Sequence, residues 1–156
     1  YWSADLKEGK EIVYSESVTK YIDGVLVLPE NLGKGKDHLK SLGIVMGFTA
    51  WEYLDDTKSG IIKMRENPTF LGVLGQGLKN RVDGVYCNID VANYYLEKGF
   101  GDSKGLVFDP DLPHTKSSYY FSTIKYPKVI KEFNEFLIDN KDKIENLKKE
   151  YGIKNY

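Results

Sequence analysis

Short apolar segments alternate with helix-like segments between residues 43 and 108 of the chain. The strand-like segments are rich in β-branched and aromatic residues, and turn or capping residues separate them from amphipathic stretches. Such alternation is typical of βαβ units, whose right-handed crossovers place consecutive strands parallel to each other. The sequence therefore predicts an α/β fold, with a parallel-rich sheet and helices on both faces.

The same pattern predicts where the individual elements lie. Strands are expected at residues 11–15, 25–28, 43–46, 61–64, 81–86, 106–108 and 118–124. Helices are expected at residues 37–42 (ended by Gly43), 50–54, 70–79 and 89–98, and as two segments between Pro127 and Tyr151 that break near Asp139 and Asn140. The two C-terminal helices each carry one apolar face, so this end of the chain differs from the alternating region.

Charge and length limit the classes of function. The chain has 156 residues, with 22 Lys and Arg against 23 Asp and Glu, so its formal net charge is −1. This balance gives no general attraction to nucleic acid or to an anionic membrane surface. The longest unbroken apolar run, Val25–Leu28, is far too short to cross a bilayer. At this length we expect one domain or two small lobes.

The residue types that usually carry catalysis or hold metals are scarce. Cys87 is the only cysteine, so it cannot form an internal disulfide, and the histidines are His38 and His114. Cys87 follows the apolar stretch 82–86, where a lone cysteine is usually a buried apolar side chain and not a nucleophile. Neither a Gly-x-Ser-x-Gly motif nor a phosphate-binding glycine loop is present. The sequence therefore predicts no enzyme activity, no cofactor and no metal site.

The turn Gly47-Phe48-Thr49 is a candidate binding element. It follows an expected strand and precedes an expected helix, where free backbone N–H groups favour an anionic group. Thr49 also fits a purely structural role, as the N-cap of that helix in a capping box with Glu52. The strand at 81–86 leads in a similar way to Asn88 and Asp90. Because the carboxyl ends of parallel strands meet at one edge, we expect these two turns to lie near each other.

Several stretches together resemble a known protein family. They are Leu39–Thr49, Asn80–Tyr86 with Val91-Ala92 and Tyr94-Tyr95-Leu96, and Tyr119–Pro127, preceded by Glu11–Ser15 and Val25–Val27. In this order and spacing they resemble the extracytoplasmic solute-binding proteins of amino-acid ABC transporters, which have the type 2 periplasmic binding fold. The resemblance implies two α/β lobes, joined by two hinge strands, that close over a ligand bound between them.

The resemblance also implies a division of the chain. Residues 1–23 would form part of lobe 1, 24–29 a hinge strand, 30–116 lobe 2, 117–123 the returning hinge strand, and 124–156 the C-terminal helices of lobe 1. The family's opening strands and helices of lobe 1 have no counterpart before Tyr1. We therefore expect a fragment or a reduced form of such a protein, with an exposed apolar face that favours self-association.

The family's ligand contacts map onto few positions of this chain. Thr49 and Ser3 fall on hydroxyl residues that contact the ligand carboxylate. The arginine that pairs with this carboxylate falls on Glu8, and the acidic residue that holds the ligand's ammonium falls on Asn88, with Asp90 two positions away. A carboxylate cannot replace a guanidinium, so these departures favour a weakly charged or uncharged ligand.

The candidate ligand-binding residues are Ser3, Tyr14, Gly47, Phe48, Thr49, Asn88 and Asp90. Among the aromatic residues, Trp2, Tyr14 and Phe48 are candidates for the walls of the cleft. Tyr86 and Tyr120 are expected to be structural, and Phe133 and Phe136 are expected to serve the core.

The function implied by the resemblance is capture of a small polar solute, an amino acid or a related compound, for the membrane permease of an ABC transporter. The same resemblance implies a periplasmic or extracytoplasmic location. One alternative is a ligand-sensing module of a signalling receptor. Another, less in keeping with the residues, is a dehydratase-like enzyme, for which Glu8, Glu16 and Asp90 are the convenient carboxylates. Nucleic acid is not expected as a partner.

Overall fold

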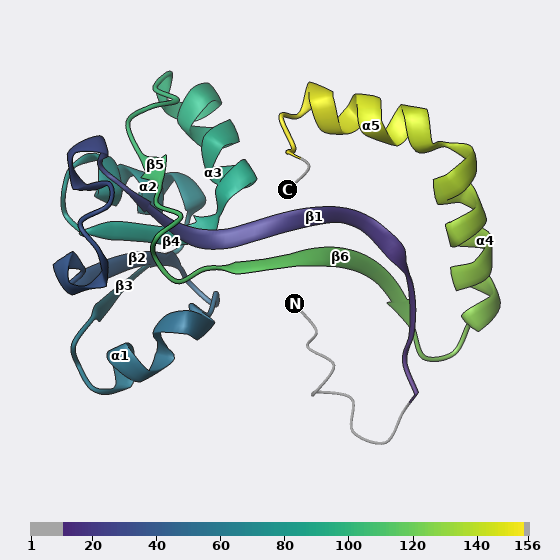
Figure 1. The fold of residues 1–156 in the computed structure, drawn as a ribbon, viewed down its shortest axis with the longest axis horizontal. Helices are drawn as coiled ribbons and strands as arrows, with labels where there is room; N and C mark the ends of the chain where they lie inside the picture. The colour runs from purple at the N-terminus through teal and green to yellow at the C-terminus, as the bar shows by residue number, and fades with distance from the viewer. Residues whose placement is uncertain (1–10, 155–156) are drawn as a thin grey trace. The chain divides into compact units, whose positions relative to one another are not determined.

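The computed structural model describes residues 11–154 of the chain (Figure 1). The chain divides into two compact units. The central unit comprises Tyr21–Lys116, and the terminal unit comprises the residues up to Lys20 and those from Ser117 onward. Within the described range, no helix combines the length and the apolar character that crossing a membrane requires.

A six-stranded sheet organises the described part of the chain. Its strands are β1 (Val13–Val27), β2 (Ser41–Val45), β3 (Lys63–Asn67), β4 (Gly84–Asn88), β5 (Val107–Phe108) and β6 (Thr115–Thr123). The order is β3-β2-β4-β1-β5, and β6 pairs with β1. β2 lies parallel to β3 and β4, whereas β1 is antiparallel to β4 and β5. The α/β class expected from the alternating sequence is therefore confirmed.

Short helices connect the strands, and two longer helices end the chain. The α-helices are α1 (Leu54–Lys58), α2 (Phe70–Leu78), α3 (Ile89–Tyr95), α4 (Pro127–Asp139) and α5 (Lys141–Glu150). The 3₁₀ turns are η2 (Pro29–Asn31), η3 (Lys36–His38) and η4 (Trp51–Tyr53), and a π-helical turn, η5, covers Leu96–Phe100. The break between α4 and α5 falls at Asn140, as the sequence predicts.

The central unit buries side chains on both faces of its sheet. Successive residues of a strand point to opposite faces. Leu42 and Tyr86 therefore share one face, where they belong to a buried apolar cluster with Tyr53. On the other face, α2 approaches so closely that a Cβ atom added to Gly77 would lie 2.7 Å from a methyl group of Val85. Helical segments thus cover the two faces of the same strands.

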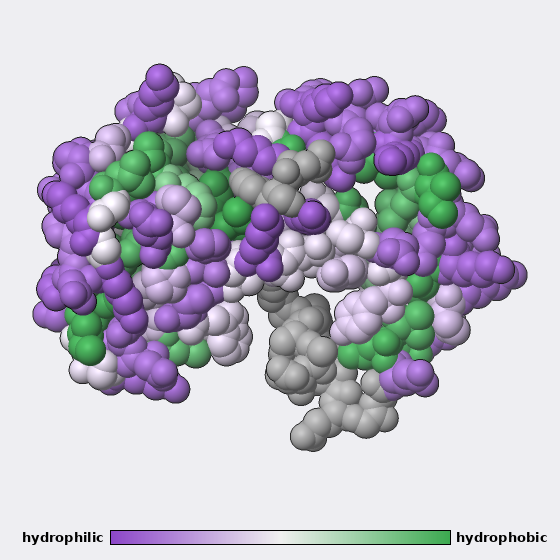
Figure 2. Space-filling model, in the orientation of Figure 1, coloured by the Kyte–Doolittle hydropathy of each residue, from purple (hydrophilic) through white to green (hydrophobic). Residues whose placement is uncertain are grey.

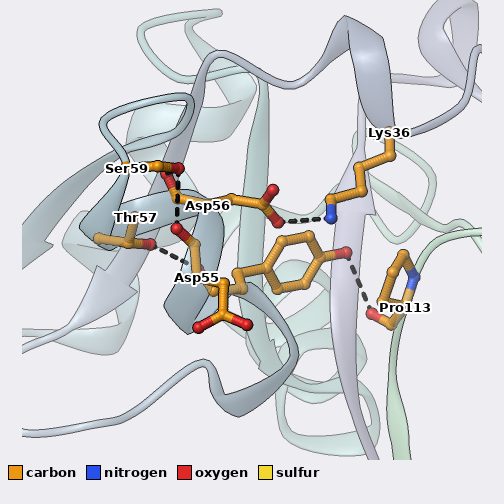
Figure 3. Close-up of polar contacts among 7 residues, drawn as sticks. Lys36, Asp55, Asp56, Thr57, Ser59 and Pro113 are labelled. Atoms are coloured by element: carbon orange, nitrogen blue, oxygen red, sulfur yellow. Dashed lines mark hydrogen bonds and ion pairs between the residues drawn. The ribbon is translucent and has the colours of Figure 1, made fainter.

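Polar contacts hold the loops of the central unit in place (Figure 3). The ammonium of Lys36 in η3 lies 2.5 Å from a carboxylate oxygen of Asp56 in α1. The hydroxyl of Tyr53 donates to the carbonyl of Pro113 at 3.0 Å, and the hydroxyl of Thr57 donates to the carbonyl of Tyr53 at 2.7 Å. These contacts tie η3, η4, α1 and the segment before β6 together.

Two expectations about the first half of the chain are wrong. Residues 11–15 and 25–28 do not form two strands, because β1 runs without interruption from Val13 to Val27. β1 pairs with β6 as well as with β4 and β5. This pairing supplies hydrogen bonds to the backbone N–H and C=O groups of the polar residues that separate the two expected strands. Residues 37–42 do not form a helix, because η3 ends at His38 and β2 begins at Ser41.

Several later elements differ from their expected bounds. β3 begins at Lys63 and β4 at Gly84, two and three residues later than expected. The α3 helix ends at Tyr95, and the π-helical turn that follows it ends at Phe100, with Gly101 as its C-cap. Gly101 has φ +66°, a left-handed conformation that glycine adopts without strain. The helix at 70–79 is confirmed, and its N-cap is Thr69, whose hydroxyl accepts from the N–H of Gly72 at 3.0 Å.

The terminal unit contains the first part of β1, most of β6, and the whole of α4 and α5. The hydroxyl of Ser15 accepts a hydrogen bond from the N–H of Phe121 at 3.0 Å, and the N–H of Glu16 donates to the side chain of Asn134 at 2.8 Å. The ring centroids of Phe121 and Phe133 lie 5.2 Å apart. Contacts of β1 with β6 and α4 therefore hold this unit together.

Part of the apolar surface of α4 is exposed. Figure 2 shows apolar surface on the terminal unit, and the exposed apolar residues of α4 are Val129, Phe136 and Ile138. Phe136 is 53% exposed, so the expectation that it serves the core is wrong. Its ring stacks on that of Phe133, with the ring centroids 6.3 Å apart.

Candidate functional site

The turn after β2 presents a free hydroxyl on the central unit. The N–H of Phe48 donates to the carbonyl of Val45 at 2.9 Å, and Gly47 has φ +83°, which favours glycine. Phe48 is half-buried and packs against the apolar cluster around Tyr53. Thr49 is exposed, and its hydroxyl forms no hydrogen bond with the described residues. That hydroxyl is therefore open to a ligand.

Thr49 does not cap a helix. The turn η4 begins at Trp51, its N-cap position is Ala50, and no side chain caps it. The capping box expected between Thr49 and Glu52 is therefore wrong. The α1 helix that follows has five residues, too few for a helix dipole to act strongly on this turn. Anion binding at the turn would depend on its backbone N–H groups and on the Thr49 hydroxyl.

A second turn follows β4, the strand beside β2. The side-chain oxygen of Asn88 accepts a hydrogen bond from the N–H of Val91 at 3.1 Å, so Asn88 is the N-cap of α3. Asp90 is half-buried in the first turn of the same helix. Because β2 and β4 are adjacent and parallel, the turns 47–49 and 88–90 lie at one edge of the sheet, as the sequence predicts.

Asp23 brings a buried carboxylate to this edge. It lies directly opposite Asn88 in the antiparallel pair of β1 and β4, so the two side chains share one face. Asp23 is 7% exposed, and its Oδ1 atom is buried without a hydrogen-bond partner among the described residues. Burial raises the pKa of Asp23 to about 6, and the charge of Glu52 acts in the same direction, whereas a hydrogen bond with Asn88 opposes the shift.

Glu52 is the second carboxylate of this region. The hydroxyl of Tyr86 donates to one of its oxygens at 2.7 Å, and the hydroxyl of Thr115 donates to the other. Burial and the hydrogen bond to Glu52 raise the pKa of Tyr86 above its ordinary range. We call Asp23, Glu52, Tyr86, Asn88 and Thr115 the acidic cluster. All five belong to the central unit.

The neighbouring Cys87 has the structural role that its sequence context predicts. It is buried, and burial followed by the charge of Asp23 raises the pKa of its thiol. A thiol in this environment stays protonated and is a poor nucleophile. Within the described range, no group of three or more His, Cys, Asp and Glu side chains could hold a metal ion.

The structure brings together only some of the predicted site residues. Gly47, Phe48, Thr49, Asn88 and Asp90 lie at the edge where β2 and β4 end. Tyr14 belongs to the terminal unit, where its ring lies edge-on to Tyr120 at a centroid distance of 6.3 Å. Tyr120 is 51% exposed, contrary to a buried structural role, whereas Tyr86 is buried as expected. Ser3, Trp2 and Glu8 lie outside the described residues.

Sequence reasoning missed Asp23, Glu52 and Thr115. The available signal was Asp23 itself, a charged residue within the strand-like run Tyr21–Leu28. A carboxylate is rarely buried without a partner, so such an interruption indicates a specific environment. In the sequence, only the spacing of Glu52 from Thr49 draws attention to it, and that spacing predicts a capping box. Of the carboxylates expected for acid–base chemistry, Glu16 lies exposed in the terminal unit.

A separate hollow of about 460 Å³ lies beside α2 in the central unit. Its lining includes Asn67, Gln76, Lys79, Arg81 and Phe100, and none of the predicted site residues. It is therefore distinct from the edge formed by the turns 47–49 and 88–90.

Comparisons with known proteins place the fold. No protein-family model matches the chain, and no curated protein matches it. The GluR0 ligand-binding core in complex with L-glutamate matches with a TM-score of 0.71 and 14% identity, over 96% of this chain and 68% of that chain. An ancestral arginine-binding protein bound to arginine matches with a TM-score of 0.68 and 16% identity, over 96% of this chain and 67% of that chain. The fold is the type 2 periplasmic binding fold.

Proteins of different roles share this fold. An amino acid ABC transporter substrate-binding protein from Streptococcus pneumoniae, bound to L-arginine, matches with a TM-score of 0.67 and 16% identity, over 96% of this chain and 64% of that chain. An ancestral amino acid-binding protein described as a precursor of cyclohexadienyl dehydratase also matches. This chain thus spans about two thirds of the length of the GluR0 core, of the ancestral arginine-binding protein and of the Streptococcus pneumoniae protein. Function must be argued from the site, because one fold serves several activities.

Proposed function

We propose that this protein binds a small polar solute outside the cytoplasm and delivers it to the membrane permease of an ABC transporter. The observation that carries the proposal is the edge of the sheet at which the turns 47–49 and 88–90 meet. There, the Thr49 hydroxyl has no hydrogen-bond partner among residues 11–154, and the buried polar groups of Asp23 and Asn88 lie on β1 and β4. Ligands of open α/β sheets bind at such carboxyl edges.

The likeness to binding proteins supports the same proposal. The structures it matches include an arginine-binding protein, an ABC transporter substrate-binding protein and a periplasmic binding protein from Legionella pneumophila. In this proposal, residues 24–29 and 117–123 are hinge strands and residues 30–116 form lobe 2. Residues 1–23 and 124–156 belong to lobe 1 in the same proposal, whereas the compact units of the structure divide between Lys20 and Tyr21.

A thermal-shift panel of amino acids, amines, small acids and sugars tests the proposal. Because a ligand that binds only the folded state raises apparent stability by mass action, we expect one chemical class of solute to raise the melting temperature. Isothermal titration calorimetry of the responding solute should then give one binding site per chain. A panel in which every solute leaves the melting temperature unchanged would overturn the proposal.

A sensing module is the second candidate, because the GluR0 ligand-binding core shares the fold. Both candidates predict solute binding, so the discriminating measurement is the partner. A transporter role predicts that the solute-loaded protein stimulates ATP hydrolysis by a reconstituted permease, whereas a sensing role predicts that it does not.

An enzyme is the third candidate, because a precursor of cyclohexadienyl dehydratase shares the fold. The pKa of Asp23, raised to about 6, is compatible with proton transfer near neutral pH. Conversion of a bound solute, followed by chromatography, would favour this candidate over both binding roles.

A further inference from the structure

The hollow beside α2 has the size of a site for a small molecule. Its volume of about 460 Å³ falls within the range of about 300–1,000 Å³ that is usual for ligand pockets. All of its lining residues belong to the central unit. The hollow shares no residue with the turns 47–49 and 88–90. A molecule bound in it would therefore occupy a site of its own.

Two glycines of α2 open the hollow. Gly72 and Gly75 lie three residues apart, on one side of the helix, and both line the hollow. A Cβ atom added to Gly75 would meet only the ring of Phe100, at 3.7 Å. Leu71 and Phe100 also line the hollow, and they are 43% and 40% exposed. Glycine backbone and two partly exposed apolar side chains therefore leave room for a flat, apolar part of a ligand.

The charged groups of the hollow are both positive. Lys79 and Arg81 line it, and no Asp or Glu is among the described residues of its lining. Within residues 11–154, neither of the two side chains forms an ion pair. Two cations without a carboxylate beside them favour a negatively charged group of a ligand.

The end of α2 brings Arg81 close to Lys79. Lys79 is the C-cap of the helix, and the next residue, Asn80, has φ +51°, a left-handed conformation. The N–H of Asn80 donates to the carbonyl of Gly77 at 2.9 Å. The N–H of Arg81 donates to the carbonyl of Gln76, also at 2.9 Å. These two bonds form a Schellman motif, which turns the chain back at the end of the helix and so holds both cations there.

Two side-chain amides add neutral donors to the lining. The Oδ1 atom of Asn67 accepts from the N–H of Thr69 at 3.1 Å and from its hydroxyl at 3.3 Å. The Oε1 atom of Gln76 is buried, and a Cβ atom added to Gly43 of β2 would lie 3.4 Å from it. Among the described residues, the N–H₂ groups of Asn67 and Gln76 form no hydrogen bond and are not buried. These two donors therefore remain available to a molecule in the hollow.

We propose that the hollow is a separate binding site for a small organic anion with a flat apolar body. A carboxylate or phosphate group of the anion accepts charge-assisted hydrogen bonds from Lys79 and Arg81. The apolar body lies on Phe100 and on the glycine surface of α2, where burial of its area adds to the affinity. This site does not depend on the proposed solute binding, because it shares no residue with the turns 47–49 and 88–90.

NMR titration of the ¹⁵N-labelled full chain tests the inference. The probes are benzoate and phenyl phosphate as anions with a ring, benzylamine and benzyl alcohol as cationic and neutral ring compounds, and inorganic phosphate as an anion without a ring. We expect both ring-bearing anions to shift the amide signals of Gly72, Gly75 and Gly99, which line the hollow. Their dissociation constants should be about 1 mM or lower, and the other three probes should bind about 10-fold more weakly or not at all.

Point variants assign the binding to its residues. Lys79→Gln and Arg81→Gln each remove one charge from an exposed side chain, so each should weaken binding of phenyl phosphate about 3- to 10-fold. Lys63→Gln is the matched control, because Lys63 is exposed in β3, outside the lining, and its variant should keep the affinity unchanged. Gly75→Ala places a methyl group inside the hollow, so it should weaken binding although it favours the helix. Weaker binding in this variant would therefore not come from a loss of folding.

Three results would overturn the inference. The first is that neither ring-bearing anion shifts the signals of Gly72, Gly75 and Gly99 at about 10 mM. The second is that benzylamine, benzyl alcohol or inorganic phosphate binds as tightly as phenyl phosphate. The third is that the double variant Lys79→Gln/Arg81→Gln keeps the affinity of the wild type. In each case the proposed solute binding stands, because its thermal-shift panel and the Thr49 variant test a different part of the central unit.

Discussion

Asp23 of β1 and Asn88 of β4 lie directly opposite each other across an antiparallel strand pair. Asn88 uses its side-chain oxygen to cap α3, so its amide N–H₂ group is the part that can donate to the carboxylate of Asp23. A carboxylate at position 88 would instead face Asp23 with a like charge, which is destabilising in cross-strand pairs. The neutral residue at 88 and the charged residue at 23 are therefore physically linked.

The first prediction concerns the pH dependence of folding stability. Burial raises the pKa of Asp23 from 3.8 to about 6. The folded chain binds this proton more tightly than the unfolded chain does. The contribution of the protonated Asp23 to the free energy of unfolding is therefore fully present below pH 3.8, and it is lost as the pH rises to about 6. The side chain of Asp23→Asn stays neutral at every pH. Above about pH 6 the variant should therefore be more stable than the wild type, with a free energy of unfolding about 1–3 kcal/mol higher.

Urea denaturation of both proteins at about pH 4, 6 and 8 measures this difference. The difference in the free energy of unfolding should grow between the first two pH values and then remain constant. Asp111→Asn is the control, because Asp111 is exposed and its variant should follow the wild type at every pH. A variant Asp23→Asn that is less stable than the wild type at pH 8 would show that the carboxylate has a stabilising partner.

The second prediction compares two glycines of α2. Replacing either Gly75 or Gly77 by Ala favours the helix by about 0.5–1 kcal/mol. A Cβ atom on Gly75 would meet only the ring of Phe100, at 3.7 Å, which is an ordinary contact. A Cβ atom on Gly77 would lie 2.7 Å from Val85 and 3.0 Å from Leu106. Gly75→Ala should therefore raise the free energy of unfolding by about 0.5–1 kcal/mol, and Gly77→Ala should lower it by about 1–3 kcal/mol.

Urea denaturation at one pH checks the pair, and each variant is the other's control for helix propensity. Equal stability of the two variants would mean that α2 shifts away from β4 to accommodate the extra methyl group, and the tight packing would then carry little energy.

The order and type of most elements follow from local sequence patterns. The apolar alternation predicts β2, β4 and the α/β class, and the polar pair Asp139-Asn140 marks the break between α4 and α5. The bounds depend on distant residues. β2 begins at Ser41 because the N–H groups of Lys40 and Ser41 both donate to the carboxylate of Asp83. No local sequence pattern reveals this distant partner.

The site shows the same division between local and distant information. The rule that parallel strands end at one edge suffices to bring Thr49 near Asn88. The position of Glu52 depends on Tyr86 and Thr115, which belong to other strands, so its spacing from Thr49 suggested a capping box that does not form. Asp23 was missed because its significance depends on its register with Asn88, and register between distant strands is not a local property.

The third prediction concerns the junction between β2 and β4. One carboxylate oxygen of Asp83 accepts hydrogen bonds from the N–H of Lys40 at 2.9 Å, the N–H of Ser41 at 2.7 Å and the hydroxyl of Ser41 at 2.9 Å. Asp83→Ala leaves all three donors without this acceptor, so it should lower the free energy of unfolding by about 2–3 kcal/mol. Ser41→Ala keeps both backbone bonds and should cost about 1 kcal/mol.

Chemical denaturation of the single variants and of the double variant measures the coupling between the two side chains. The double variant should lose less stability than the sum of the single losses, because the two residues share one network. Strict additivity would contradict the interpretation that the Ser41 hydroxyl and Asp83 act together.

The last prediction concerns Thr49. In the proposed function, its hydroxyl bonds to the ligand, and within the described residues it bonds to nothing else. Thr49→Ala should therefore weaken binding of the responding solute by about 1–3 kcal/mol and change the free energy of unfolding by less than about 0.5 kcal/mol. Thr69→Ala is the matched control, because Thr69 caps α2 through the N–H of Gly72. It should cost about 1 kcal/mol of stability and leave the affinity unchanged. Calorimetric titration and urea denaturation of both variants give the two profiles, and an unchanged affinity in Thr49→Ala would remove this residue from the binding site.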